Sequence, residues 1–266
     1  MSITFIGGGV MGEAMIKGIL AKGIASPQDI TASDVIKERL LALSQSYGIR
    51  TSASNRQAVA GSEVVVIAVK PQNLAQLMTE LKGRFTRDQL VLSIVAGARI
   101  ATIAKGLRHG SVVRAMPNTP AQIGEGMSVW TASTEVSQNQ REKAQSILRA
   151  LGAEIYVPDE GYLDMATAIS GSGPAYIFLV MEALNHAAEA IGLPREMAEK
   201  LVLQTVLGAA HLARETGRDP KELRERVTSP GGTTEKAIFE LEEGGLRALF
   251  ERAVRAAYER AKELGG

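Results

Sequence analysis

Several ordinary sources of protein chemistry are missing or scarce in this chain of 266 residues. Cysteine is absent, which excludes a disulfide framework, a thiolate nucleophile and a metal site built on thiolates. The three histidines, His109, His186 and His211, are widely scattered, and no two of them stand at the spacing of metal ligands. We therefore interpret them as structural or surface residues and expect no bound metal.

A surplus of charge and a long apolar run are missing as well. Lys and Arg total 30 against 29 for Asp and Glu, which argues against nucleic acid or an anionic membrane as the main partner. No segment has the roughly 18 apolar residues that a membrane span needs. The chain also opens on a strand-like run without a basic and then apolar leader. We therefore expect a cytoplasmic protein that binds neither nucleic acid nor membrane.

What the chain does have is a glycine-rich turn close to its start. The apolar run 2–6 is followed by glycines in the order G-x-G-x-x-G and then by the apolar-periodic stretch 14–21, which predicts strand, turn and helix. In this motif Gly7 allows a tight turn, Gly9 lets the backbone approach a pyrophosphate, and Gly12 lets the helix pack on the strand. The helix N-terminus offers N–H groups to the phosphates. We predict that a dinucleotide binds here, on Gly7, Gly9, Val10, Met11 and Gly12.

The first half of the chain alternates short β-branched runs with helix-like stretches. The run 64–69 is almost continuously β-branched, as in a parallel strand buried on both faces. This alternation predicts βαβ units and a Rossmann-type doubly wound parallel sheet. We expect strands at 2–6, 30–33, 49–51, 64–69, 90–95, 112–115, 127–130 and 155–157.

The pattern changes after Val157, where Pro158 begins a short turn and every later periodic stretch is helix-like. We therefore predict a dinucleotide-binding domain at 1–158 and an all-α domain at 162–266. Small residues such as Ala187 and Gly208 line its helices and allow close packing. An intramolecular bundle would explain them, but a helical domain of this size has apolar faces to bury, so we favour a homodimer.

Three loops follow strands of the predicted sheet, at the edge where ligands of open α/β sheets bind. Their small residues leave room for a flat ring. Lys70 is either a solvated charge or a cofactor ligand, and Asn118, between two prolines, is either a plain turn residue or a positioned polar group. The predicted cofactor residues of these loops are Ala68, Val69, Lys70, Pro71, Ala96, Gly97 and Asn118.

The sequence leaves the choice of dinucleotide open. Asp34 follows the second strand 22 positions after Gly12, where an acidic residue usually binds the ribose 2′-OH of NAD. Donors near it could instead gather round a 2′-phosphate, because Arg and Asn side chains donate to phosphate oxygens. These donors are Ser33, Lys37, Arg39, Asn55 and Arg56.

The helical domain contains two glycine-rich segments that each precede a helix, 170–174 and 228–234. Each is either a helix N-cap with flexible glycines or an anion cradle of backbone N–H groups and hydroxyls. Two of them beside a dinucleotide fold favour a small carboxylate substrate. No acid–base constellation accompanies them, which suits hydride transfer to an iminium carbon positioned by a hydroxyl. The predicted substrate residues are Ser172, Gly173, Ser229, Gly231, Gly232 and Thr233.

Five motifs in order, F-I-G-G-G-V-M-G, A-V-K-P, M-P-N-T-P, S-G-S-G-P-A-Y and V-T-S-P-G-G-T-T, span nearly the whole chain. With them the chain resembles the pyrroline-5-carboxylate reductases. The resemblance implies reduction of L-1-pyrroline-5-carboxylate to L-proline with NADPH or NADH, the last step of proline biosynthesis. It also implies an enzyme that assembles as a dimer or as a decamer built from dimers. It implies that the threonine contacting the substrate nitrogen is Thr234. It also implies that Ser229, Gly232 and Thr233 bind the carboxylate and that Asn55 lies on the adenine side. Asp34 departs from the small polar residue of many members, which argues against a strong preference for NADP.

Two other functions remain as alternatives. A reductase of another cyclic imine or of a β-hydroxyacid belongs to the same enzyme class, and the latter should offer a lysine general acid near the nicotinamide. Lys200 and Lys236 lie outside the glycine-rich segments. A non-catalytic dinucleotide sensor would keep the glycine turn but would not need both anion cradles.

Overall fold

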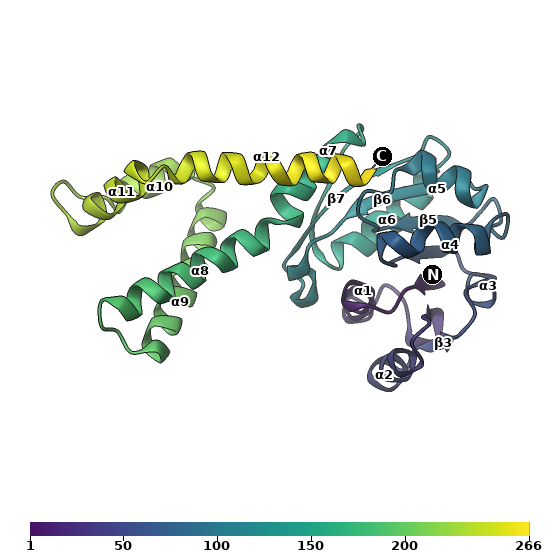
Figure 1. Ribbon diagram of the computed structural model, residues 1–266. Helices are drawn as coiled ribbons and strands as arrows, with labels where there is room; N and C mark the ends of the chain where they lie inside the picture. The colour runs from purple at the N-terminus through teal and green to yellow at the C-terminus, as the bar shows by residue number, and fades with distance from the viewer. Residues whose placement is uncertain (266) are drawn as a thin grey trace. The chain divides into compact units, whose positions relative to one another are not determined.

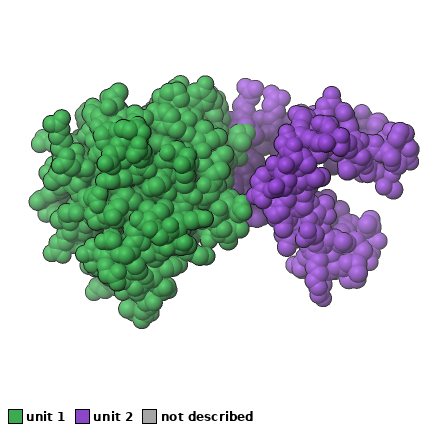
Figure 2. All heavy atoms as spheres, turned by 180° about the vertical axis from the view of Figure 1, so that it is seen from behind, with its two compact units in different colours: residues 1–172, 257–266 green, residues 173–256 purple. Residues whose placement is uncertain are grey.

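The computed structural model describes residues 1–265 and divides the chain into two compact units, which Figure 2 colours separately. Unit 1 comprises Met1–Ser172 and Ala257–Gly266, of which Gly266 is not described, and unit 2 comprises Gly173–Ala256. The division falls later than the expected boundary at 158–162. The reason is that Arg114, on a central strand, forms ion pairs of 2.9 Å with both Glu160 and Asp164, which ties the segment after residue 158 to the sheet.

Unit 1 is built on one sheet of eight strands in the order β3-β2-β1-β4-β5-β6-β7-β8 (Figure 1). The strands are β1 (Ile3–Ile6), β2 (Ile30–Ser33), β3 (Arg50–Ser52), β4 (Val64–Ile67), β5 (Leu90–Ser93), β6 (Val112–Met116), β7 (Gly126–Ala132) and β8 (Gly152–Tyr156). Its helices are α1 (Val10–Ala21), α2 (Lys37–Tyr47), α3 (Asn55–Ala58), α4 (Pro71–Leu81), α5 (Ile100–Leu107), α6 (Gln138–Arg149) and α7 (Gly161–Ala166). Two 3₁₀ turns, η1 (Pro27–Asp29) and η2 (Thr119–Ile123), and a π-helical turn, η3 (Thr167–Gly171), complete it.

The predicted Rossmann-type sheet is confirmed, with one correction to the expectation that it is all parallel. Strands β1 to β6 pair in parallel, but β7 runs antiparallel to β6, with Ala115 opposite Trp130. Only the short segment 117–125, with η2, joins these two strands. A parallel return needs a crossover of a dozen or more residues, so the short link reverses the chain instead.

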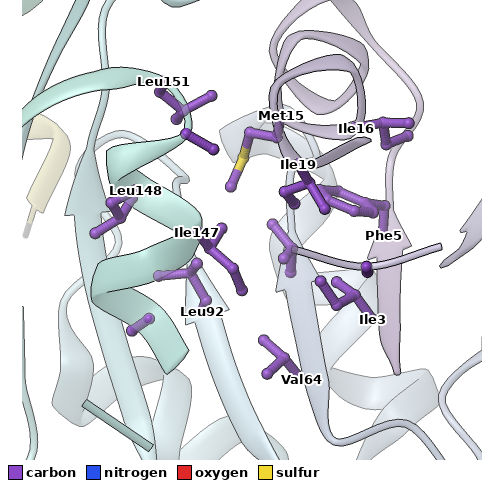
Figure 3. Packing of buried hydrophobic residues seen from close by; sticks show 14 of the residues in the cluster. Ile3, Phe5, Met15, Ile16, Ile19, Val64, Leu92, Ile147, Leu148 and Leu151 are labelled. Carbon is purple, nitrogen blue, oxygen red and sulfur yellow. The ribbon is translucent and has the colours of Figure 1, made fainter. Parts of the chain in front are cut away.

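The alternating side chains of the central strands divide the core of unit 1 between the two faces of the sheet. On β4, Val64 and Val66 belong to one hydrophobic cluster, while Val65 and Ile67 belong to the other. Figure 3 shows the first cluster, in which Met15 and Ile19 of α1 lie near Phe5 of β1. Strand β4 is thus buried on both faces, as its β-branched run predicted.

Unit 2 consists of helices, as the sequence predicts. These are α8 (Gly173–Ala190), α9 (Arg195–Thr216), α10 (Pro220–Arg226), α11 (Thr233–Glu243) and the first part of α12 (Leu246–Gly265), whose last residues belong to unit 1. Helices α8 and α9 pack on each other. No helix in the described part of the chain is long and apolar enough to cross a membrane.

Candidate functional site

The glycine turn has the conformation that its spacing predicts. Gly7 has a φ of +105°, and a Cβ at this position would lie 2.6 Å from the carbonyl oxygen of Ala68. A Cβ on Gly9 would instead have no atom within 4 Å, so a ligand can approach the backbone here. Helix α1 begins at Val10 with no side chain capping its first N–H groups. These features fit a pyrophosphate bound at the start of α1.

The middle of the turn is held from both sides by residues that follow β2. The Gly8 N–H donates to Asp34 Oδ2 at 2.7 Å, and the other carboxylate oxygen of Asp34 accepts from Ile36 N–H at 3.0 Å. The Gly8 carbonyl accepts from Nε of Arg39, whose Nη2 pairs with the carboxylate of Glu13. Asp34 therefore has a structural partner in the turn itself, whatever it contributes to binding a ribose.

Glu13 and Tyr47 complete this cluster, and sequence reasoning missed both. The Tyr47 hydroxyl donates to Glu13 Oε1 at 2.9 Å. The hydrogen bond from Arg39 is the main cause that lowers the pKa of Glu13, whereas burial, followed by the bond to Glu13, raises the pKa of Tyr47. Glu13 stands in the first turn of α1, but no local pattern reveals that its partners come from α2.

Most of the other residues considered as ligands of a 2′-phosphate form hydrogen bonds with other residues of the chain. Ser33 Oγ donates to Asn55 Oδ1 at 2.8 Å, and Asn55 Nδ2 donates to Glu80 Oε2 at 2.9 Å. Arg56 Nε donates to the Glu80 carbonyl at 3.3 Å. Lys37, at the start of α2, is exposed.

The loops after β4 and β5 lie at the same edge of the sheet as the glycine turn. Val69 follows β4, and the exposed Lys70 precedes α4, which Pro71 begins. Ala96 is half-buried after β5. Gly97, with φ of +75°, packs on the chain's own C-terminal turn, since a Cβ there would lie 2.5 Å from the Leu264 carbonyl oxygen.

Asn118 has two structural partners. Its Nδ2 donates to the Ser170 carbonyl at 3.0 Å, and its Oδ1 accepts from Met127 N–H at 2.8 Å. The amide therefore fastens the start of β7 to the segment after α7.

The segment 170–174 differs from the free helix start that the sequence predicted. Ser170 and Gly171 belong to the π-helical turn η3, which joins α7 to α8, and Ser172 N–H donates to the Thr167 carbonyl at 2.8 Å. Gly173 is already the first residue of α8. The Ser172 N–H therefore has a partner within the turn, and π-turns often mark functional positions.

The second glycine-rich segment does lead into a helix N-terminus. Helix α11 begins at Thr233, with Gly232 before it and no side chain capping it. The Gly231 N–H donates to Glu235 Oε2 at 2.7 Å, so a carboxylate of the same chain already lies at this helix start. Ser229 is exposed and Thr234 is half-buried.

The strand order and the glycine turn together define a Rossmann-type dinucleotide-binding protein. Over 100% of its length the chain is 43% identical to pyrroline-5-carboxylate reductase of Synechocystis, covering 98% of that relative. It is 44% identical to that of Pseudomonas aeruginosa over 98% of the chain and 96% of the relative. The chain belongs to the pyrroline-5-carboxylate reductase family.

Family models and solved structures agree with this assignment. Residues 160–264 match the model of pyrroline-5-carboxylate reductase dimerisation, and residues 2–97 match that of the coenzyme F420-dependent NADP oxidoreductases. The reductase structure from Coxiella burnetii superposes with a TM-score of 0.92 at 45% identity, covering 100% of this chain and 98% of that one. A Plasmodium falciparum pyrroline carboxylate reductase with NADP bound gives 0.90 at 28% identity, with the same coverages. The protein is thus an NAD(P)H-dependent reductase of proline biosynthesis that forms a homo-oligomer.

Proposed function

We propose that this enzyme reduces the C=N bond of L-1-pyrroline-5-carboxylate and that Thr234 orients the substrate nitrogen. The start of α11 supports this assignment of Thr234, because no side chain caps the helix there and hydroxyls stand beside its backbone N–H groups. A bound nicotinamide would supply a hydride to the carbon of the iminium form of the substrate, whose nitrogen already carries its proton and becomes the amine of proline. No strong acid is needed, because no oxyanion forms.

The carboxylate of the substrate is the group that the α11 start suits. Ser229, Gly231, Gly232 and Thr233 would bind it, at the positive end of the helix dipole. The Gly231 N–H already donates to Glu235 Oε2 at 2.7 Å. On binding, the carboxylate of the substrate would replace the Glu235 carboxylate as the acceptor of this hydrogen bond. Ser172 and Gly173 remain secondary candidates beside the π-turn.

The cofactor is proposed to lie on the turn between β1 and α1 and on the loops that follow β4, β5 and β6. The pyrophosphate would bind at Gly7, Gly9, Val10, Met11 and Gly12, and the ribose near Ser33, Asp34 and Asn55. The loop residues proposed for the nicotinamide side are Ala68, Val69, Lys70, Pro71, Ala96, Gly97 and Asn118.

The direct test combines purified protein, pyrroline-5-carboxylate and NADPH or NADH, with absorbance at the reduced nicotinamide band and proline measured together. We expect cofactor oxidation with an equal amount of proline formed. Cofactor binding without turnover would indicate a dinucleotide sensor, and turnover only with another cyclic imine or a β-hydroxyacid would indicate one of the other reductases.

Thr234 is tested by two substitutions. Thr234→Ala should lower kcat/KM by about 10- to 100-fold, the effect of losing one positioning hydrogen bond, whereas Thr234→Ser keeps the hydroxyl and should stay within a few fold of the parent. Equal values for the alanine variant and the parent would remove the role assigned to Thr234.

We also propose that the assembly is a homodimer, or a decamer built from such dimers, and that the enzyme acts in the cytoplasm. The match of residues 160–264 to a dimerisation model supports the dimer. Light scattering coupled to size exclusion distinguishes two subunits from ten, and cell fractionation tests the location.

A further inference from the structure

The cluster beside the glycine turn bears on the choice between NADH and NADPH, which differ by a phosphate on the adenosine ribose. In Rossmann folds the ribose lies at the end of the second strand, where an acidic residue selects the hydroxyl and an arginine accommodates the phosphate. Here Asp34 and Arg39 both stand in that region, and both contact the Gly8 peptide. The two opposing determinants are therefore neighbours.

Arg39 is not a free cation in this arrangement. Its Nη2 pairs with the Glu13 carboxylate while its Nε donates to the Gly8 carbonyl, and both side chains of the pair are half-buried, at 28% and 31% exposure. Tyr47 fixes the second oxygen of Glu13 at 2.9 Å. Glu13 is held in its charged form, since the bond from Arg39 lowers its pKa.

The charges of Asp34, Glu13 and Arg39 together also disfavour a 2′-phosphate. Asp34 and Glu13 carry two negative charges against the single positive charge of Arg39, so the cluster is net negative by one. Two lysines partly offset this charge: Lys17 lies near enough to lower the pKa of Glu13 further, and Lys37 is exposed on α2. A 2′-phosphate brings close to two negative charges at neutral pH, whereas the hydroxyl of NADH brings none.

We propose that Glu13 is a specificity-determining residue that acts through Arg39: by neutralising this arginine it weakens the use of NADPH relative to NADH. Glu13 needs no contact with the cofactor for this role. The inference rests on the proposed reduction by NAD(P)H, and it adds a residue outside the glycine motif to the determinants of cofactor choice.

The test is the ratio of kcat/KM for NADPH to that for NADH. Glu13→Gln removes one negative charge and keeps the side chain's size, so the ratio should rise about fivefold, because one fewer negative charge repels the 2′-phosphate. The rise should come from NADPH, with the values for NADH nearly unchanged. It should shrink when NaCl is raised, because salt screens the interaction.

Two further variants separate charge from structure. Tyr47→Phe removes the other hydrogen bond to Glu13 but no charge, and should leave the ratio as in the parent. The double variant Glu13→Gln with Arg39→Gln restores the parent's net charge, and should return the ratio to the parent's value.

The proposal is overturned if Glu13→Gln leaves the ratio unchanged, if Tyr47→Phe shifts it equally, or if the double variant keeps the full increase. Dissociation constants of NADP⁺ and NAD⁺, measured by calorimetry without substrate, give the same ratio independently of turnover. A parent enzyme that binds both dinucleotides but fails to reduce pyrroline-5-carboxylate would therefore contradict the proposed function and still leave this inference testable.

Discussion

The two units bury their apolar residues in opposite ways. Unit 1 places side chains such as Phe5 and Val65 entirely out of solvent, one in each of the two clusters that cover the faces of its sheet. Among the described residues of unit 2, only Ala198 and Val202 are buried hydrophobics, while Phe178 is 63% exposed and Leu203 56%. A single chain therefore completes the core of the sheet unit but leaves the helical unit with its apolar faces open, and a homo-oligomer supplies what is missing.

The charged residues show the same contrast. In unit 1, Arg114 is 3% exposed and pairs with two carboxylates inside the fold. Several pairs in unit 2 are exposed ones within a helix, such as Arg195 with Glu199 at 2.9 Å, with 78% and 52% of the side chains exposed. Buried pairs are costly to break, whereas exposed pairs contribute little. The sheet unit is thus held together by pairs in its interior, whereas these exposed pairs of the helical unit contribute little to its stability.

The largest effect should follow from placing a charge on the open face of the helical unit. Phe178→Glu should raise the dissociation constant of the oligomer about a hundredfold or more, because an unpaired charge would be buried on assembly. Sedimentation velocity over a range of concentrations measures this. Ile123→Glu is the matched control, since Ile123 is 76% exposed on unit 1, and should leave the assembly intact. If both variants dissociated equally, the assembly would not depend specifically on the apolar surface of the helical unit.

The second largest effect should be the loss of stability when the buried ion pairs of Arg114 in unit 1 are broken. Arg114→Met leaves Glu160 and Asp164 without their shared cation and should cost about 3–5 kcal/mol of stability. Arg195→Met in unit 2 should leave the stability almost unchanged, because its pair with Glu199 is exposed. Thermal unfolding followed by circular dichroism compares the two variants at equal protein concentration.

Two leucine-to-alanine substitutions test whether each leucine is buried within one chain or only on assembly. Leu92→Ala should destabilise the protein by about 3 kcal/mol through the cavity it leaves, at every protein concentration. The effect of Leu203→Ala should instead depend on concentration, because it weakens assembly first. Unfolding midpoints at two concentrations a hundredfold apart check this, and a concentration-independent loss for Leu203→Ala would show that its face is covered within one chain.

The smallest effect concerns acid pH. The pKa of Glu13 lies below its ordinary value of 4.5, so its pair with Arg39 stabilises the folded state above that value. This stability is lost as the pH falls through the lowered pKa. The loss should be below about 1 kcal/mol, because the pair is partly exposed. The parent should therefore lose slightly more stability than Glu13→Gln between neutral and acid pH. Glu242→Gln, at an exposed pair of unit 2, should differ from the parent in the same direction but by less, because the bond from Arg247 that lowers the pKa of Glu242 is screened by solvent.

Much of the fold could be predicted from local patterns. The helices α2 and α5 begin and end where the periodicity of 37–47 and 100–107 places them, and the strand β2 also has its predicted bounds. These elements follow from short-range propensity. The antiparallel direction of β7 was not predicted, because strand direction depends on the path of the connection and not on the residues of the strand.

The candidate site was predictable only where the backbone itself makes it. The glycine positions imply the turn, since the requirement for φ of +105° at Gly7 is local. The partners of Asp34 were not predictable, because they depend on which side chains the tertiary fold brings to the Gly8 peptide. The π-turn at Thr167–Gly171 was hidden for a different reason: Ser and Gly are typical of loops, yet here they continue a helix.

The two hydrogen bonds on the Gly8 peptide have a thermodynamic consequence. Its N–H and its carbonyl are both satisfied by side chains of the neighbouring βα unit before any ligand arrives. The turn is therefore preorganised, and the conformational entropy of ordering it is lost during folding rather than on binding. The amide hydrogen of Gly8 should accordingly exchange slowly with solvent in the free protein, although it belongs to a loop.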